Sequence, residues 1–310
     1  MSSTDGTGRE LSGARVLVTG AGGFVGRHLC RRLLDQGAEV WGTVRPGAPV
    51  PHGVRGLPVD LTDGAALTAA VQRAAPDLAL HLAAARAKGT GAERLASTLV
   101  NAVSGVHLVE ALPASCRAVV RLGSATEYAE SDRPMDEVAP LRPRGFFGAG
   151  KAAGSLLLVA SAQERGLRSA VLRAFQVYGP GDHPGRFVPA VLRAAADGSV
   201  LPLTGPGRRR DWVHVDDVVR GCLLAAGADD LPPGQVLNLG TGVQTANEEL
   251  VALVEQVTGR PVRTQVGAHP GRSWDTGSWV CDPALAARLL GWQPAVDLRS
   301  GLARTWADPA

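Results

Sequence analysis

Residues 14–37, ARVLVTGAGGFVGRHLCRRLLDQG, join a short apolar run to an amphipathic run through a glycine-rich turn. The Val- and Leu-rich run at 14–20 is typical of a strand buried in a parallel sheet. Residues 24–37 predict a helix, because their apolar residues recur at helical spacing and a glycine ends the pattern. The stretch therefore predicts the first strand and first helix of a strand–helix–strand unit.

The turn itself carries Gly20, Gly23 and Gly26, spaced three residues apart. Gly20 allows the tight turn, Gly23 lets the backbone approach a pyrophosphate, and Gly26 lets the helix pack on the strand. The free N–H groups at the start of the helix then face the phosphates. The turn predicts dinucleotide binding, with the first helical residues, Phe24 and Val25, also in contact with the cofactor.

The alternation of strands and helices continues along the chain. Further strands are predicted at 38–45, 55–61, 78–84, 118–124 and 169–179, with helices between them that include 92–112 and about 150–165. This pattern predicts the α/β class, a Rossmann-type doubly wound parallel sheet with helices on both faces. We expect a disordered tail at 1–12, a dinucleotide-binding domain at 13–180 that also receives about 211–242, and a smaller substrate-binding lobe from 181–210 and 243–310.

Composition excludes several classes of protein. The net charge of +3 is too small for a nucleic-acid partner, and no run reaches the about 18 apolar residues that a membrane span requires. The four cysteines are scattered without ligand spacing, which favours reduced thiols, no metal site and a cytoplasmic location.

The end of the second strand bears on the choice of cofactor. The stretch Thr43-Val44-Arg45 has no carboxylate to hold ribose hydroxyls, and the guanidinium of Arg45 suits a 2′-phosphate. We therefore predict NADPH (NADP) as the cofactor, with NADH as the alternative. Asp60 and Leu61, after the third strand, suit an adenine pocket.

The chain resembles the extended short-chain dehydrogenase/reductase family of the NAD-dependent epimerase/dehydratase type over about residues 13–305. The matching motifs, beside the glycine turn, are VDL (59–61), LHLAA (80–84), NAVSG (101–105), GSATEY (123–128), LRAFQVYGPG (172–181), RDWVHVDD (210–217), LNLGTG (237–242) and LLGWQP (289–294).

The resemblance implies roles for individual residues. Ser124 would hydrogen-bond the substrate carbonyl oxygen, Thr126 would offer a second hydroxyl to the substrate, and Lys151 would hold the nicotinamide ribose. Leu82, Ala83, Ala84 and Asn101 would line the cofactor. Arg210 matches an arginine that contacts the diphosphate in nucleotide-sugar members.

His81 and His214, by contrast, are expected in the core. Asp216 and Asp217 are expected to cap the helix that follows them.

Phe147 departs from the family pattern, because members carry a tyrosine four residues before the lysine. That tyrosine exchanges the proton as hydride moves, and the lysine lowers its pKa. Losing a positioned acid costs about 10²- to 10⁴-fold in rate, whereas electrostatic stabilisation of a developing alkoxide remains. Ser124, Thr126 or Tyr128 could relay a proton through water, or Lys151 could act directly.

A third alternative is that the substrate stabilises its own alkoxide, as an aromatic polyketide can. In this respect the chain resembles atypical ketoreductases of the simocyclinone (angucyclinone) kind, which lack the tyrosine. The main hypothesis is therefore an NADPH-dependent ketoreductase of an aromatic ketone in antibiotic biosynthesis, acting at a substrate site of Ser124, Thr126, Tyr128, Phe147 and Arg210.

Two alternatives to this hypothesis stay open. The first is a dTDP- or UDP-hexose ketoreductase or epimerase, which Arg210 favours, and the second is a non-catalytic NADP-binding regulator. The chain is expected to be a monomer or a homodimer.

Overall fold

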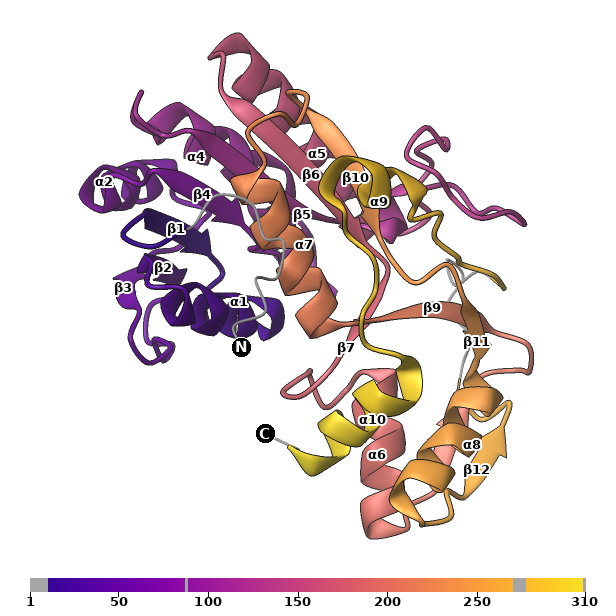
Figure 1. Ribbon diagram of the computed structural model, residues 1–310. Helices are drawn as coiled ribbons and strands as arrows, with labels where there is room; N and C mark the ends of the chain where they lie inside the picture. The colour runs from indigo at the N-terminus through magenta and orange to yellow at the C-terminus, as the bar shows by residue number, and fades with distance from the viewer. Residues whose placement is uncertain (1–10, 87–88, 270–276, 309–310) are drawn as a thin grey trace, which may run out of the picture.

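The computed structural model describes residues 11–86, 89–269 and 277–308. Its main sheet has seven parallel strands in the order β10-β6-β5-β4-β1-β2-β3 (Figure 1). The strands are β1 Arg15–Thr19, β2 Glu39–Val44, β3 Arg55–Pro58, β4 Leu78–His81, β5 Ala118–Ser124, β6 Arg168–Ala174 and β10 Gln235–Leu239. The predicted Rossmann-type fold is confirmed. The order reverses at β1, so the crevice beside β1 and β4 is where such sheets bind ligands.

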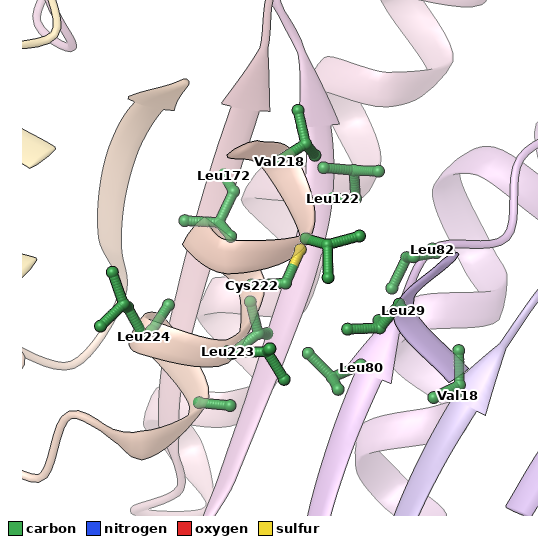
Figure 2. Close-up of a cluster of buried hydrophobic side chains, with 14 of the residues drawn as sticks. Val18, Leu29, Leu80, Leu82, Leu122, Leu172, Val218, Cys222, Leu223 and Leu224 are labelled. Carbon is green, nitrogen blue, oxygen red and sulfur yellow. The ribbon is translucent and has the colours of Figure 1, made fainter. Parts of the chain in front are cut away.

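Helices cover both faces of this sheet. One face carries α1 Phe24–Asp35 and α7 Val215–Gly227, and the other carries α2 Gly64–Ala74, α4 Ser104–Ala111 and α5 Phe146–Glu164. Figure 2 shows the hydrophobic core between α1, α7 and the sheet, where Leu29 of α1 and Cys222 of α7 pack near Leu80 and Leu122 of the sheet. Burial of this apolar surface fixes both helices on the sheet.

The remaining elements build a smaller part with its own core. A three-stranded sheet contains β7 Gln176–Tyr178, β9 Arg209–His214 and β11 Gln244–Ala246, and a two-stranded sheet contains β8 Leu201–Leu203 and β12 Thr264–Val266. Three helices pack in this core: α6 Phe187–Asp197, α8 Asn247–Thr258 and α10 Leu298–Ala307. A further helix, α9 Ala284–Leu290, packs near β10 and α7.

Two of the predicted elements differ from the structure. The strand expected at 169–179 is two strands. The last bond to the main sheet runs from Phe175 N–H to the carbonyl of Leu239, and β7 then pairs with β9 in the smaller sheet. The helix expected at 92–112 is interrupted. It consists of α3 Gly91–Thr98, a π-helical turn at Leu99–Val103, and α4.

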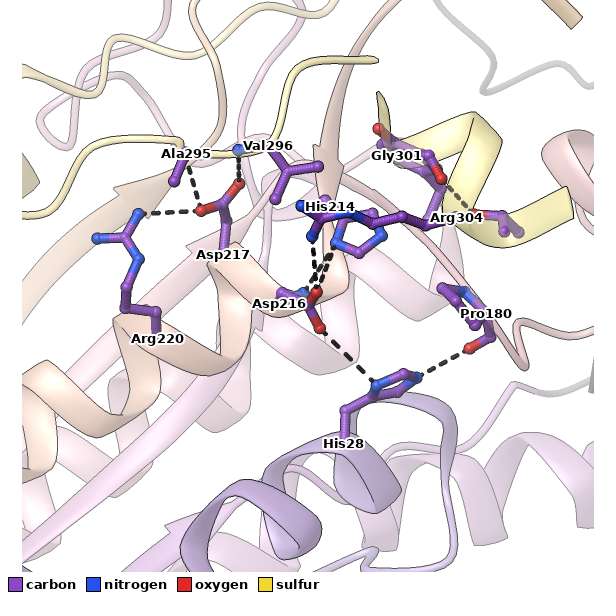
Figure 3. Close-up of polar contacts among 12 residues, drawn as sticks. His28, Pro180, His214, Asp216, Asp217, Arg220, Ala295, Val296, Gly301 and Arg304 are labelled. Carbon is purple, nitrogen blue, oxygen red and sulfur yellow. Dashed lines mark hydrogen bonds and ion pairs between the residues drawn. The ribbon is translucent and has the colours of Figure 1, made fainter. Parts of the chain in front are cut away.

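The first turn of α7 differs from the expected capping pattern. The side chain of His214 caps this helix by accepting from Asp216 N–H at 3.2 Å. Asp217 instead accepts from the N–H groups of Ala295 and Val296, at 2.9 and 3.0 Å (Figure 3). The expectation that Asp217 caps its own helix is wrong, because its carboxylate bonds the segment between α9 and α10.

A second contact joins α1 to the smaller part. His28 Nε2 donates to the carbonyl of Pro180 at 2.8 Å, and its Nδ1 lies 4.0 Å from Asp216 (Figure 3). The same carboxylate lies 3.4 Å from His214 and 3.4 Å from Arg304 of α10. These contacts hold the loop at 180 beside the helix that follows the glycine turn.

The Asp217 contact predicts a large effect on stability. Asp217→Ala leaves the buried N–H of Val296 and the partly buried N–H of Ala295 without an acceptor, which costs about 1–3 kcal/mol of unfolding free energy. We expect a clearly lowered melting temperature in calorimetry. The matched variant Asp230→Ala, at an exposed position, should change the free energy by less than about 0.5 kcal/mol. Equal melting temperatures for the two variants would contradict this role of Asp217.

Candidate active site

The glycine turn is packed too tightly for other residues. Gly20 has a φ of +72°, and a Cβ there would lie 2.9 Å from the Cα of Ala83. A Cβ on Gly26 would lie 2.2 Å from the carbonyl oxygen of Gly20. Gly23 caps α1 without a side-chain hydrogen bond, so no side chain competes for the N–H groups of the first turn. Phe24 and Val25 begin that turn, and the arrangement suits a pyrophosphate.

The residues expected at the adenosine end lie at the adjacent strand ends. Thr43 of β2 bonds the turn through its carbonyl, which accepts from Ala21 N–H at 3.1 Å, and Arg45 follows two residues later with an exposed side chain. Asp60 accepts from the N–H and the hydroxyl of Thr62, both at 2.9 Å, and these bonds lower its pKa. Leu61 beside it is half-buried.

The loop after β4 forms the opposite wall. Leu82 and Ala83 are buried and Ala84 is exposed. The buried amide of Asn101 holds the next residue, Ala85, by accepting from its N–H at 2.9 Å and donating to its carbonyl at 2.7 Å. Asn101, which lies in the π-helical turn, therefore fixes the path of this loop. Such turns are frequent at functional sites.

Ser124 and Thr126 form a hydroxyl pair at the carboxyl end of β5. Their oxygens lie 2.8 Å apart, and Ser124 Oγ also accepts from Thr126 N–H at 3.2 Å. Glu127, fully buried, accepts from Ser124 N–H at 2.8 Å and pairs with Arg173 at 2.9 Å. The pair is therefore held at a fixed place beside the sheet.

Tyr128 lies elsewhere. Its side chain is 1% exposed, and its hydroxyl donates to Asn238 at 2.8 Å. Burial raises the pKa of Tyr128 to about 12. The expected contact of Tyr128 with substrate, and its use as a proton relay, do not fit this position, because the hydroxyl is bound inside the core.

The start of α5 brings Phe147 and Lys151 to the hydroxyl pair. A Cβ on Gly148 would lie 2.2 Å from the carbonyl oxygen of Thr126, so the first turn of α5 packs directly on that backbone. Lys151 Nζ donates to the carbonyl of Leu122 at 2.8 Å. Phe147, one turn earlier, is half-buried. Ser124, Thr126, Phe147 and Lys151 thus gather where α5 meets the end of β5.

Lys151 is 3% exposed, and it donates to a backbone carbonyl rather than to a carboxylate. Burial, together with the charges of Arg121 and Arg86, lowers its pKa to about 7, against an opposing effect of Glu127. Arg121 is itself buried and donates to the carbonyl of Asn101 at 2.5 Å. The sequence analysis did not single out Arg86 or Arg121. An arginine inside the apolar run AVVRLGS was the available signal for Arg121.

The other expected residues lie outside this cluster or in the core. His81 is fully buried, between the hydroxyls of Thr19 and Ser104, and burial holds its pKa well below the ordinary value. Arg210 lies half-buried on β9 in the smaller part and donates to the carbonyl of Arg209 at 2.6 Å. Its contact with a diphosphate stays a prediction.

Comparison with known proteins identifies the family. The model of the NAD dependent epimerase/dehydratase family matches residues 16–240, and the chain belongs to that family. The predicted assignment to an NAD(P)-dependent redox enzyme is confirmed at this level, as is a nicotinamide dinucleotide as the class of cofactor.

Individual relatives are similar over nearly the whole chain. A dTDP-6-deoxy-L-talose 4-dehydrogenase (NAD(P)(+)) of Kitasatospora kifunensis is 33% identical, with 97% of each chain covered. A UDP-glucose 4-epimerase of Mycolicibacterium smegmatis is 33% identical, covering 94% of this chain and 97% of the relative. The structure of MoeE5 in complex with UDP-glucose and NAD is 32% identical with a TM-score of 0.85, covering 94% of this chain and 97% of that one.

These findings correct the main functional hypothesis. The relatives and solved structures are nucleotide-sugar enzymes, so the prediction of an aromatic polyketide ketoreductase in antibiotic biosynthesis is wrong, and the alternative on nucleotide sugars is the better supported. Phe147 was given too much weight as a sign of an aromatic substrate. Within the described ranges, none of the helices has the length and apolar character that crossing a bilayer requires.

The pKa of Lys151 can be measured directly, because the only other lysine in the chain is Lys88. In ¹³Cε-lysine NMR of the free protein, we expect Lys151 to titrate near pH 7, charged below and neutral above. Lys88→Arg assigns the signal. Two lysine signals that both titrate above pH 10 would contradict the burial of this ammonium.

The lowered pKa of Lys151 makes the stability of the fold depend on pH. Unfolded lysine keeps a pKa near 10.5, so between about pH 7 and that value the unfolded chain binds more protons than the folded chain. This group therefore adds stability as pH rises through the window. Lys151→Met should flatten that part of the pH dependence in denaturant titrations.

Proposed function

We propose that the chain is an NADPH-dependent ketoreductase that acts on a dTDP- or UDP-activated keto-hexose. The observation that carries this proposal is the cluster of Ser124, Thr126 and Lys151 at the end of β5, next to the glycine turn, with Phe147 in place of an acid. The nucleotide-sugar relatives support the class of substrate.

In this proposal each residue has a stated role. The hydroxyl groups of Ser124 and Thr126 bond the keto oxygen of the hexose, and Lys151 bonds the ribose of the cofactor. The first turn of α1 binds the pyrophosphate. The bound reduced nicotinamide would supply hydride, and the chain orients the carbonyl and excludes water from its buried side.

We propose that the substrate extends from the cluster toward a depression in the surface between Tyr128 and Phe147. A cavity of about 560 Å³ is lined by residues 129–132 and 142–144, the two segments that follow Tyr128 and precede Phe147. Cavities of roughly 300–1,000 Å³ hold small-molecule ligands. Arg210 is proposed to bond the diphosphate, because guanidinium groups match phosphate oxygens in geometry and charge.

Reduction is favoured over epimerisation by the absence of a tyrosine at 147. Epimerisation moves hydride and proton in both directions, and each direction loses a positioned acid or base. Net reduction needs stabilisation of one alkoxide, after which a proton can come from water. The first-named relative is a 4-dehydrogenase, which supports carbonyl and alcohol interconversion without inversion.

This proposal predicts NADPH consumption with a keto-sugar substrate. Purified protein should oxidise NADPH with dTDP-4-keto-6-deoxyhexose or its UDP counterpart, measured at 340 nm, and give one sugar alcohol per NADPH consumed. The control is the same reaction with the unactivated keto-hexose, which lacks the diphosphate. Interconversion of UDP-glucose and UDP-galactose without net NADPH oxidation would instead establish an epimerase.

The preference for NADPH over NADH depends on Arg45. Arg45→Ala should weaken NADPH binding by about tenfold or more, because a charge-assisted bond to the 2′-phosphate is lost, and should leave NADH binding unchanged. Calorimetric titration measures both affinities. A matched variant is Arg55→Ala, an exposed arginine that pairs with Glu39 instead. Equal losses for both cofactors would contradict the assigned role.

A further inference from the structure

An arginine lies on the ring that stands in the tyrosine position. The guanidinium carbon of Arg86 is 4.3 Å from the centroid of the Phe147 ring, well within the about 6 Å range of cation–π contacts. Arg86 follows Ala85, which the buried amide of Asn101 holds on both its N–H and its carbonyl. The backbone that presents Arg86 is therefore anchored directly before it.

The charge of Arg86 reaches the cluster. It is one of the charges that lower the pKa of Lys151, beside burial, Arg121 and the opposing Glu127. Burial raises the pKa of Asp182, in the loop after β7, and the charge of Arg86 is among the effects that oppose this rise. The exposed side chain of Arg86 is therefore close enough to act electrostatically on both Lys151 and Asp182.

The phenylalanine at position 147 can position the guanidinium group of Arg86. Its ring face holds a guanidinium through the ring quadrupole, while its edge offers no hydroxyl to compete for the substrate oxygen. A guanidinium keeps its charge at all working pH values and presents several N–H donors in a plane. It can thus stabilise a negative oxygen without giving up a proton.

We propose that Arg86, stacked on Phe147, is a catalytic residue that donates N–H bonds to the keto oxygen and stabilises the negative charge that develops there. The inference rests on the proposed function. It assigns to Arg86 the charge stabilisation to which a tyrosine hydroxyl at position 147 would contribute. It separates charge stabilisation from proton donation, and the first of these is often the larger effect.

The step balances without an acid from the chain. The bound reduced nicotinamide cofactor would supply a hydride to the carbonyl carbon and would itself be oxidised, while the π pair of the C=O bond moves to oxygen. That oxygen takes a proton from water, which leaves hydroxide to the solvent. Arg86 remains protonated throughout, with Ser124 and Thr126 as additional donors to the same oxygen.

The first test needs no substrate or cofactor. Arg86→Ala removes a positive charge near Lys151, so the ¹³Cε signal of Lys151 should titrate at a higher pH than in the wild type. Arg94→Ala, an exposed arginine of α3, is the matched control and should leave the signal unchanged. An unchanged titration in Arg86→Ala would overturn the placement of the guanidinium.

The second test measures the chemical step. In single-turnover NADPH oxidation with a dTDP- or UDP-linked 4-keto-hexose, Arg86→Ala should lower the rate about 100-fold. The affinity for NADPH should stay unchanged, Arg86→Lys should recover part of the rate, and added guanidinium ion should rescue Arg86→Ala. Arg94→Ala should match the wild type.

The outcomes separate the two proposals. A wild type that turns over, with an Arg86→Ala variant of equal rate or one that changes only KM, overturns the catalytic role of Arg86 alone. The catalytic role is also overturned if neither guanidinium ion nor Arg86→Lys restores any of the lost rate, because the loss is then a structural effect. A wild type that oxidises no NADPH with either nucleotide keto-sugar overturns the proposed function and this role together.

Discussion

Lys151 donates to the carbonyl of Leu122 at 2.8 Å from a side chain that is only 3% exposed. Placing an ammonium there requires α5 to pack closely on the end of β5, which Gly148 allows by leaving room for the backbone of Thr126. The same packing brings Phe147 and the hydroxyl pair of Ser124 and Thr126 together. Because burial disfavours the charged form, this packing lowers the pKa of Lys151 to about 7.

The charges around this lysine explain how a site without tyrosine can still favour a negative oxygen. Arg121 and Arg86 add positive charge near Lys151, and Glu127 is already paired with Arg173. In a partly buried crevice such charges act more strongly than in water. The proposed site therefore relies on fixed donors that stabilise the oxygen, whereas its proton comes from solvent.

The sequence predicted the fold well, because the glycine turn and the alternation of strands and helices are local signals. It could not predict the strand break at Phe175, because β7 pairs with β9, a segment distant in the sequence. Tyr128 was misplaced for the same reason, since Asn238 of β10 determines where its hydroxyl points. The substrate class was wrong because Phe147 alone says what is absent, and the neighbouring Arg86 is visible only in three dimensions.

In the proposed function, the chain delivers hydride from NADPH to the keto carbon of a nucleotide-activated hexose. The most direct test is the reaction of NADPH deuterated at both C4 positions with dTDP-4-keto-6-deoxyhexose or its UDP counterpart, followed by NMR and mass spectrometry of the sugar product. We expect one deuterium at the former carbonyl carbon and a single configuration there. A product with no deuterium at that carbon, or unchanged substrate with either nucleotide sugar, would contradict it.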